Sequence, residues 1–255
     1  MRILVCVKRV PAPGARIVLT EDQQAIDTNL LSFTVSPHEE CAVEEGVQLA
    51  EKHDGTVTVL TLGPPEAEEQ LRSALAVGAN EAVLIPTGGE DWDPISTASA
   101  LASAIGELES DQPFDLILFG NESADAGGYQ VGIRVARALG RPIVSGIKGI
   151  EVEAGSVRLM RDTPTGSEVY ELPLPAMVCV KEGINLPRYP TLKGRLNAKK
   201  VEVQRLEGDR VGSGQIMVRL ITPPQVVSET TILGDGADAA VAVVDLLEEL
   251  QVVGK

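Results

Sequence analysis

A chain of 255 residues is long enough for one large α/β domain or two small ones. Its formal net charge of −15 argues against nucleic acid or an anionic membrane as the main partner. Apolar residues make up 44% of the chain and aromatic residues only 3%, so the core must be aliphatic, which suits parallel strands covered by helices on both faces.

The cysteines and histidines are too few and too scattered for a metal site. Cys6, Cys41 and Cys179 lie in apolar or helical contexts, which is typical of buried thiols in a reducing compartment. His38 and His53 are the only histidines, which argues against zinc or His-based catalysis. No stretch approaches the ~20 apolar residues that cross a bilayer, so we expect a cytoplasmic protein without membrane insertion.

The first 140 residues alternate between the apolar runs of buried strands and the periodicity of amphipathic helices. Strands are predicted at residues 2–7, 56–62, 81–85 and 114–119. Helices are predicted at residues 36–52, 66–77, 93–109 and 129–139. This order predicts a doubly wound, mostly parallel sheet with right-handed crossovers, whose ligands bind at the carboxyl ends of the strands.

Local signals mark where some of these elements begin and end. Ser36 is a candidate N-cap, Pro37 fits the first helical position and Glu39 completes a capping box. Residues 8–14 (KRVPAPG) contain two prolines and one glycine and are predicted to form a loop. This proline-rich sequence differs from the Ser/Gly-rich loop of an ATP pyrophosphatase. His53, near the end of the first helix, is interpreted as structural.

Residues 120–132 (GNESADAGGYQVG) lie between the fourth predicted strand and its helix. A glycine-bearing loop that leads into a helix presents free N–H groups and the positive end of the helix dipole. Gly127 and Gly128 would let the backbone come close to a ligand such as a phosphate. A strand-to-helix turn that binds nothing remains the alternative.

The pattern changes after Gly140. Residues 157–160 and 169–172 are predicted to form a hairpin around DTPTG, between strands at 143–147 and 176–180. Residues 181–200 (KEGINLPRYPTLKGRLNAKK) contain six basic residues and one acidic residue. This segment is predicted to be either a solvated loop or a docking loop for an acidic partner, with Tyr189 and Leu192 as apolar anchors.

The C-terminal part is predicted to be an arm followed by a helix. Residues 206–224 have little periodicity, and residues 237–250 form a helical pattern that would pack on a neighbour. The sequence GDGADA at 234–239 matches a dinucleotide fingerprint only formally, because Asp235 and Asp238 would face the pyrophosphate. Together with the lack of a His or Tyr/Lys acid–base pair, this argues against a dehydrogenase.

Several stretches together resemble the β subunit of electron transfer flavoproteins, the family that includes the FixA proteins. They are RILVCVKRVP, SPHEECAVEEGVQLAEK, VTVLTLGPPEAEEQLRSALAVGANEAVLI, DLILFGNESADAGGYQVG, LPAMVCV and NLPRYPTLKGRLNAKK. The resemblance implies a Rossmann-like, adenine nucleotide alpha hydrolase-like fold with a β-hairpin addition. It also implies a nucleotide-binding domain at 1–182, a partner-recognition loop at 183–204, and a C-terminal arm and helix at 205–255 that pack on the α subunit.

The resemblance implies a heterodimer with an α subunit and a FAD held mostly by that subunit. Such a protein carries electrons from dehydrogenases to a quinone reductase or another acceptor, without independent catalysis. The family's AMP contacts fall on Cys6, Ser36, Pro37, His38, Glu39, Leu62, Gly120, Asn121, Glu122, Ser123, Ala124, Asp125, Ala126, Gly127, Gly128, Tyr129, Gln130 and Val131. Partner recognition falls on Arg188, Tyr189, Leu192, Lys193 and Arg195.

The chain departs from the family pattern at two places. Ser36-Pro37-His38 stands where many members have Asn-Pro-aromatic, a position near the flavin, so His38 is a candidate to contact or tune FAD. Asn121 stands where many members have lysine, which leaves phosphate binding to backbone amides and the helix terminus.

Two alternatives to an AMP-binding β subunit stay open. An electron-bifurcating β subunit would hold a second FAD in place of AMP; the loop after the first strand favours AMP. A regulatory module similar to universal stress proteins would form homodimers and bind ATP without flavin. The basic segment at 181–200 and the arm at 206–224 have no role in such a module.

Overall fold

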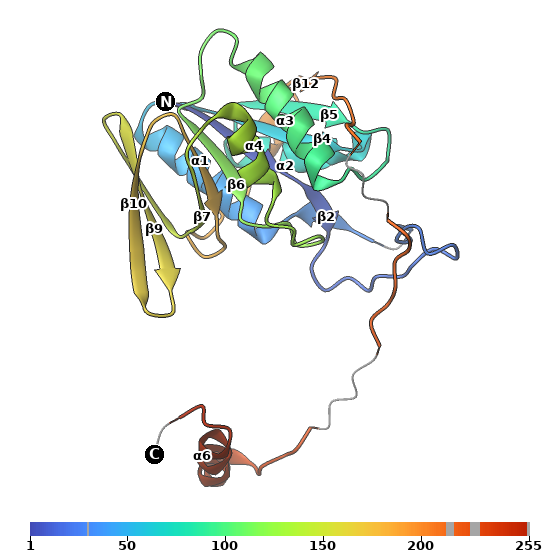
Figure 1. The fold of residues 1–255 in the computed structure, drawn as a ribbon, viewed down its shortest axis with the longest axis vertical. Coiled ribbons are helices and arrows are strands. Elements are labelled where there is room, and N and C mark those ends of the chain that lie inside the picture. The colour runs from blue at the N-terminus through green and yellow to red at the C-terminus, as the bar shows by residue number, and fades with distance from the viewer. Residues whose placement is uncertain (30, 213–216, 225–229, 254–255) are drawn as a thin grey trace. The chain divides into compact units, whose positions relative to one another are not determined.

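The computed structural model describes all residues except 30, 213–216, 225–229 and 254–255. The chain forms two units, Met1–Val218 and Arg219–Lys255. The first unit is built on a seven-stranded sheet with the order β12-β5-β4-β1-β6-β11-β7 (Figure 1). The strands are β1 (Arg2–Val7), β4 (Thr56–Gly63), β5 (Glu81–Pro86), β6 (Leu116–Gly120), β7 (Ile143–Ile147), β11 (Ala176–Val180) and β12 (Val203–Arg205). All neighbours in this sheet pair in parallel, which confirms the predicted architecture.

Helices cover both faces of this sheet. They are α1 (Pro37–Lys52), α2 (Glu68–Val77), α3 (Pro94–Leu108) and α4 (Val131–Leu139). Because side chains alternate along a strand, Ile3 and Val5 of β1 join the core beside α1 and α2, whereas Leu4 and Cys6 join the core beside α3 and α4. The aliphatic, nearly aromatic-free composition is therefore explained by strands that are buried on two sides.

In the first 140 residues, element ends differ from the prediction by one or two residues, which is the usual uncertainty of such boundaries. The helix predicted at 66–77 opens with a 3₁₀ turn, η1 (Pro65–Ala67), and α4 begins two residues later than predicted. The predicted loop at 8–14 is wrong in part. It contains β2 (Arg9–Pro11), which pairs antiparallel with β3 (Phe33–Val35). Arg9 stacks on Phe33, 3.4 Å from the ring centroid, and this contact between distant segments gives no signal in local sequence.

A separate three-stranded antiparallel sheet has the order β10-β9-β8. The predicted hairpin is formed by β9 (Ser156–Thr163) and β10 (Gly166–Pro173), the yellow strands of Figure 1. The sequence analysis missed β8 (Gly149–Glu153), which pairs with β9 and has only two apolar side chains.

The predicted loop at 181–200 is also wrong in part, because it contains the short helix α5 (Leu192–Ala198). Thr191 caps this helix by accepting a hydrogen bond from Gly194 N at 3.0 Å. At the other end, Arg72 of α2 donates to Ala198 O at 2.6 Å. A seven-residue helix has little stability of its own, so these contacts explain why it forms.

Part of the predicted arm belongs to the sheet. Leu206 is buried, and its N–H donates to Leu84 O at 3.0 Å, next to the pairing of β12 with β5. Residues 213–216 of the arm lie outside the described residues. In the described part of the chain, no helix is long and apolar enough to cross a membrane.

The second unit contains a 3₁₀ turn, η2 (Gly236–Ala239), and α6 (Ala240–Glu249), close to the predicted helix at 237–250. Counting the described residues, none of the side chains of α6 is buried; Val241 is 70% exposed and Leu250, just after the helix, is 61% exposed. Packing of this helix on a neighbour stays a prediction, as do the domain boundaries at 182 and 204.

The contact of α5 with α2 can be tested by a matched pair of glycine substitutions. A Cβ at Gly194 would lie 2.2 Å from Ala76 O of α2, whereas a Cβ at Gly106 of α3 would meet no described atom within 4 Å. We expect Gly194→Ala to lower the free energy of unfolding by about 1–3 kcal/mol. Gly106→Ala should raise it by about 0.5–1 kcal/mol, because glycine is unfavourable in a helix. Urea titration of both variants checks this, and equal effects would contradict the close contact.

Candidate functional site

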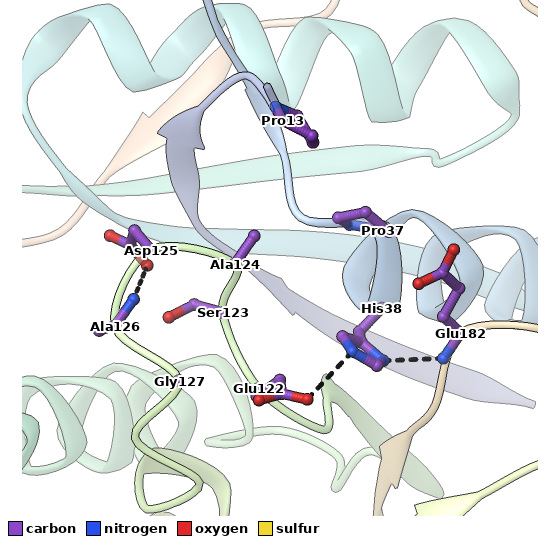
Figure 2. A pocket seen from close by; sticks show the side chains of 10 residues that line it. All are labelled: Pro13, Pro37, His38, Glu122, Ser123, Ala124, Asp125, Ala126, Gly127 and Glu182. Carbon is purple, nitrogen blue, oxygen red and sulfur yellow. Dashed lines mark hydrogen bonds and ion pairs between the residues drawn. The ribbon is translucent and has the colours of Figure 1, made fainter. Parts of the chain in front are cut away.

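A cavity of about 440 Å³ lies beyond the carboxyl ends of β1 and β6. After β1 the chain builds β4 and β5 on one side and returns to β6 on the other, so the strand order reverses between β1 and β6. Such a reversal is where open α/β sheets bind ligands. Figure 2 shows the residues that line the cavity: Pro13, Pro37, His38, Glu122, Ser123, Ala124, Asp125, Ala126, Gly127 and Glu182.

The first turn of α1 reaches the cavity because residue 120 is a glycine. A Cβ at Gly120 would lie 2.6 Å from Glu39 Cγ, which is closer than such atoms approach, and 3.2 Å from Glu39 N, which is a tight contact. Ser36 does occupy the N-cap position, but its hydroxyl donates to Glu122 O at 3.4 Å. As far as the described residues show, Ser36 makes no side-chain cap, so this half of the predicted capping box is wrong.

His38 connects two walls of the cavity. Its Nδ1 accepts a hydrogen bond from Glu182 N at 2.8 Å, and its Nε2 lies 3.3 Å from Glu122 Oε1 (Figure 2). These partners fix the orientation of the imidazole, with Nε2 as the donor toward Glu122. The resemblance implies that His38 contacts the nucleotide, and His38 does line the cavity. Its proximity to FAD stays a prediction.

Glu39, Lys8 and Asp125 join three segments beneath the cavity. Glu39 is only 7% exposed, and its Oε2 accepts from Lys8 N at 2.5 Å. Burial raises the pKa of Glu39 to about 8, although the hydrogen bond and the charge of Lys8 oppose this shift. Lys8 Nζ lies 2.5 Å from Asp125 Oδ2. Partial burial alone would raise the pKa of Asp125, but the Lys8 ammonium and several hydrogen bonds hold it below its usual value.

Two hydrogen bonds within the loop after β6 shape its backbone. Gly127 N donates to Ser123 O at 2.9 Å, and Ala126 N donates to Asp125 Oδ1 at 2.8 Å. Gly127 has a φ of +53°, a left-handed conformation that glycine adopts without strain.

The N–H groups at the start of α4 are the donors that a bound anion could use, because the first N–H groups of a helix have no partner within it. Gln130, the N-cap residue, accepts from Arg134 Nη2 at 2.9 Å instead of capping the helix.

Asn121, at the lysine position of many family members, holds the loop to the sheet. Its Oδ1 accepts from Gly146 N at 2.8 Å, and its N–H donates to Val180 O at 2.8 Å. The side chain is therefore engaged with β7 rather than with the cavity.

The structure brings together only part of the predicted site. The cavity lining includes Pro37, His38 and the loop residues 122–127. Ser36, Glu39, Gly120 and Asn121 lie beside or beneath it, and Gly128, Tyr129, Gln130 and Val131 lead into α4. Cys6 is buried in the core, where burial raises the pKa of its thiol, and the half-buried Leu62 packs against that same core.

The sequence analysis missed Pro13, Glu182 and Lys8. Glu182 and Lys8 each follow a strand that ends at this edge of the sheet, which is a signal that could have found them. Pro13 comes from a loop whose course depends on the pairing of β2 with β3, so local sequence gives no such signal.

The predicted recognition residues lie in and before α5. Leu192 is 75% exposed and Tyr189 is 94% exposed; Lys193 and Arg195 are also exposed. Leu196 follows Leu192 by four residues and is exposed on the same face of the helix. These exposed leucines beside basic residues agree with the predicted combination of apolar anchors and positive charge.

Arg188 has a different environment. Its guanidinium donates to Glu44 Oε2 at 2.9 Å and to Glu51 Oε1 at 2.7 Å, both on α1. These carboxylates raise the pKa of Arg188 above its usual value, and the hydrogen bonds that Arg188 donates to Glu51 contribute most. A contact of Arg188 with a partner stays a prediction.

The buried carboxyl of Glu39 gives the folded protein a pH dependence. Since the pKa of Glu39 is raised to about 8 from its usual 4.5, the folded state binds more protons than the unfolded state between these values. Its contribution to stability is thus fully present below about pH 4.5 and is lost as pH rises through about 8, by at most about 5 kcal/mol.

We therefore expect the difference in free energy of unfolding between wild type and Glu39→Gln to shift in favour of the variant between pH 5 and pH 8. Denaturant titrations at several pH values measure it, with the exposed Glu66→Gln as the control. A difference independent of pH would mean that the folded state holds Glu39 with an ordinary pKa.

Comparison with known proteins identifies the family. The profile described as "Electron transfer flavoprotein domain" matches residues 26–211. The electron transfer flavoprotein subunit beta of Bacillus subtilis is 33% identical over 254 residues, which cover 97% of each chain. The subunit of that name from Mycobacterium leprae is 37% identical over 257 residues, covering 94% of this chain and 96% of the relative. That of Megasphaera elsdenii is 31% identical over 272 residues, covering 100% and 99%. The resemblance drawn from the sequence is thus confirmed, and the chain belongs to the electron transfer flavoprotein family, among its β subunits.

Proposed function

We propose that this chain is the β subunit of a heterodimeric electron transfer flavoprotein, and that it binds AMP in the cavity between β1 and β6. The observation that carries this proposal is the meeting of the first turn of α1, the loop after β6 and the segment after β11 at the reversal of strand order. Membership of the electron transfer flavoprotein family is the reason for proposing a heterodimer and a bound flavin. The chain then acts as an electron carrier subunit.

The residues present fit a nucleotide with a single phosphate. The first N–H groups of α4 offer donors for a phosphate, and Lys8 adds one ammonium, which it shares with Asp125. Glu122, Asp125 and Glu182 also line the cavity, so the walls carry three carboxylates. Carboxylates accept hydrogen bonds from ribose hydroxyls but repel the additional charges of a triphosphate. This balance favours AMP over the ATP of a universal-stress-like module.

FAD, held mostly by the α subunit, would supply the redox chemistry when bound. This chain would contribute binding, orientation and electrostatics. His38 is held in place between Glu122 and Glu182, which gives it the fixed position that a contact near a flavin requires. The apolar residues exposed on α6 and the low-periodicity arm before it are suited to packing on the α subunit.

Dehydrogenases would dock on the exposed apolar face of α5. Leu192 and Leu196 provide the apolar contact, and Lys193 and Arg195 provide positive charge for an acidic partner. Small apolar centres with charged rims are typical of transient interfaces, in which a few residues carry most of the binding free energy.

The nucleotide content of the heterodimer tests the proposal. We expect the complex obtained by co-expression with its α subunit to release one FAD and one AMP on denaturation, identified by chromatography and mass spectrometry. Two FAD and no AMP would replace this function with that of an electron-bifurcating β subunit. ATP without flavin would overturn it.

A pair of lysine variants ties the AMP to this cavity. Lys8→Met removes the ammonium and leaves Asp125 unpaired, so AMP should bind about tenfold more weakly, as expected for loss of a charge-assisted hydrogen bond. Lys199→Met, which removes an exposed lysine elsewhere, should leave the AMP affinity unchanged. Calorimetric titration measures both, and equal affinities would place AMP at another site.

The docking role of α5 can be tested with Leu192→Ala. Because Leu192 is exposed, its truncation should leave the free energy of unfolding unchanged. As a central apolar contact, it should lower the second-order rate of flavin reduction by a dehydrogenase about tenfold or more. Val169→Ala, an exposed apolar residue of β10, is the control. If both variants react at the wild-type rate, dehydrogenases dock elsewhere.

A further inference from the structure

One helix, α1, contacts both the candidate nucleotide cavity and the segment that leads to α5. At its first turn, His38 Nδ1 accepts from Glu182 N at 2.8 Å. One turn further, Asn185 Nδ2 donates to Cys41 O at 3.1 Å and to Glu45 Oε2 at 2.9 Å. The first residues of the recognition segment are thus bound directly to α1.

The strongest contact between this segment and α1 is made by Arg188. Arg188 binds Glu44 through two nitrogens, with Nε 2.9 Å from Oε2 and Nη2 3.0 Å from Oε1, and it binds Glu51 through Nη1 at 2.7 Å. The Glu44 side chain is only 4% exposed. A buried carboxylate without its cation is costly, so Glu44 fixes the position of Arg188.

The spacing of these contacts shows that the segment runs parallel to α1. Residues 182, 185 and 188 meet successive turns of the helix between residues 38 and 51. The backbone N–H of Arg188 donates to Glu44 Oε2 at 3.1 Å, and its guanidinium reaches on to Glu51. The segment 182–188 therefore follows α1 in the same direction, and we call it the α1 strap.

The α1 strap also forms part of the cavity wall. Glu182 lines the cavity, and His38 joins it to Glu122 of the loop after β6, as Figure 2 shows. A ligand in this cavity thus lies against the first residue of the strap. After the strap, the chain continues through Tyr189 to α5, whose apolar face is exposed.

We propose that occupancy of the cavity and order of the α1 strap are linked through His38 and α1, and that Arg188 is a positioning residue for both. A nucleotide that contacts the cavity wall stabilises Glu182 in place, and the strap holds the approach to α5 in its docking conformation. By reciprocity, whatever loosens the strap weakens nucleotide binding by the same factor. This inference rests on the proposed function, and it gives the nucleotide a role in presenting the docking surface.

Hydrogen exchange of the purified heterodimer, freed of AMP by dialysis and titrated with AMP, tests the linkage. We expect AMP to slow exchange of the amides at 182–188 at least about threefold. Amides of β8 and β9, which belong to the separate sheet, should exchange at unchanged rates. Unchanged exchange at 182–188 with AMP bound would overturn the linkage.

The reciprocal measurement uses variants at the far end of the strap. Arg188→Ala should weaken AMP binding about fivefold, the lower end of usual coupling, although no atom of Arg188 lines the cavity. Glu51→Gln removes one of the two carboxylates that bind Arg188 and leaves no buried charge unpaired. It should therefore weaken AMP binding by a smaller factor. Arg158→Ala, which breaks an exposed pair with Glu151, is the control and should bind AMP as wild type does.

The outcomes separate this inference from the proposed function. If wild type binds AMP, and Arg188→Ala and Glu51→Gln bind it equally well, the linkage is wrong and the nucleotide site stands. If wild type binds no AMP in this assay, both proposals fall. If Arg188→Ala does not fold, the loss of affinity in Glu51→Gln decides the question alone.

Discussion

The close approach of α1 to the end of β6 is the contact on which the candidate site depends. It exists because Gly120 has no side chain, which lets the first turn of α1 lie against the strand end. As a result, Glu39 is buried beneath the loop after β6, and His38 reaches both Glu122 and Glu182. Because Gly120 lacks a Cβ, α1, the loop after β6 and the start of the recognition segment can lie close together.

The cavity is held by polar contacts that link separate elements rather than by apolar packing. Lys8 follows β1, Glu39 begins α1 and Asp125 follows β6, and hydrogen bonds of 2.5 Å join Lys8 to both carboxyls. In partly buried surroundings such contacts are strong only if each group has its partner. Glu39 and Asp125 can therefore lie close together because Lys8 binds both of them.

The architecture could be predicted from the sequence because the parallel sheet and its helices rest on local periodicity. The helix predicted at 93–109 is α3, and Asp93 caps it by accepting a hydrogen bond from Ile95 N at 2.9 Å. Elements that rest on distant partners were missed. β2 needs Phe33, more than 20 positions away, and α5 needs Arg72 of α2. No window of sequence contains both partners of such a contact.

The same reason limits the prediction of the site. Glu39 carries the local signature of a capping box, but its carboxyl also accepts a hydrogen bond from Lys8 N, 31 positions earlier in the chain, which no local pattern predicts. The basic charge of residues 181–200 predicts either a solvated loop or a docking loop for an acidic partner. Yet Arg188 turns toward the chain's own Glu44 and Glu51.

That pairing changes how the charge reversal of residues 181–200 is understood. A guanidinium bound to two carboxylates adds little net positive field for a partner, so attraction has to come from the exposed Lys193 and Arg195. The charge of Arg188 instead orders the backbone that precedes them. A flexible basic loop would have to be ordered when a partner binds, at a cost in affinity. A segment fixed along α1 avoids that cost, which suits the small apolar face that we propose as the docking surface.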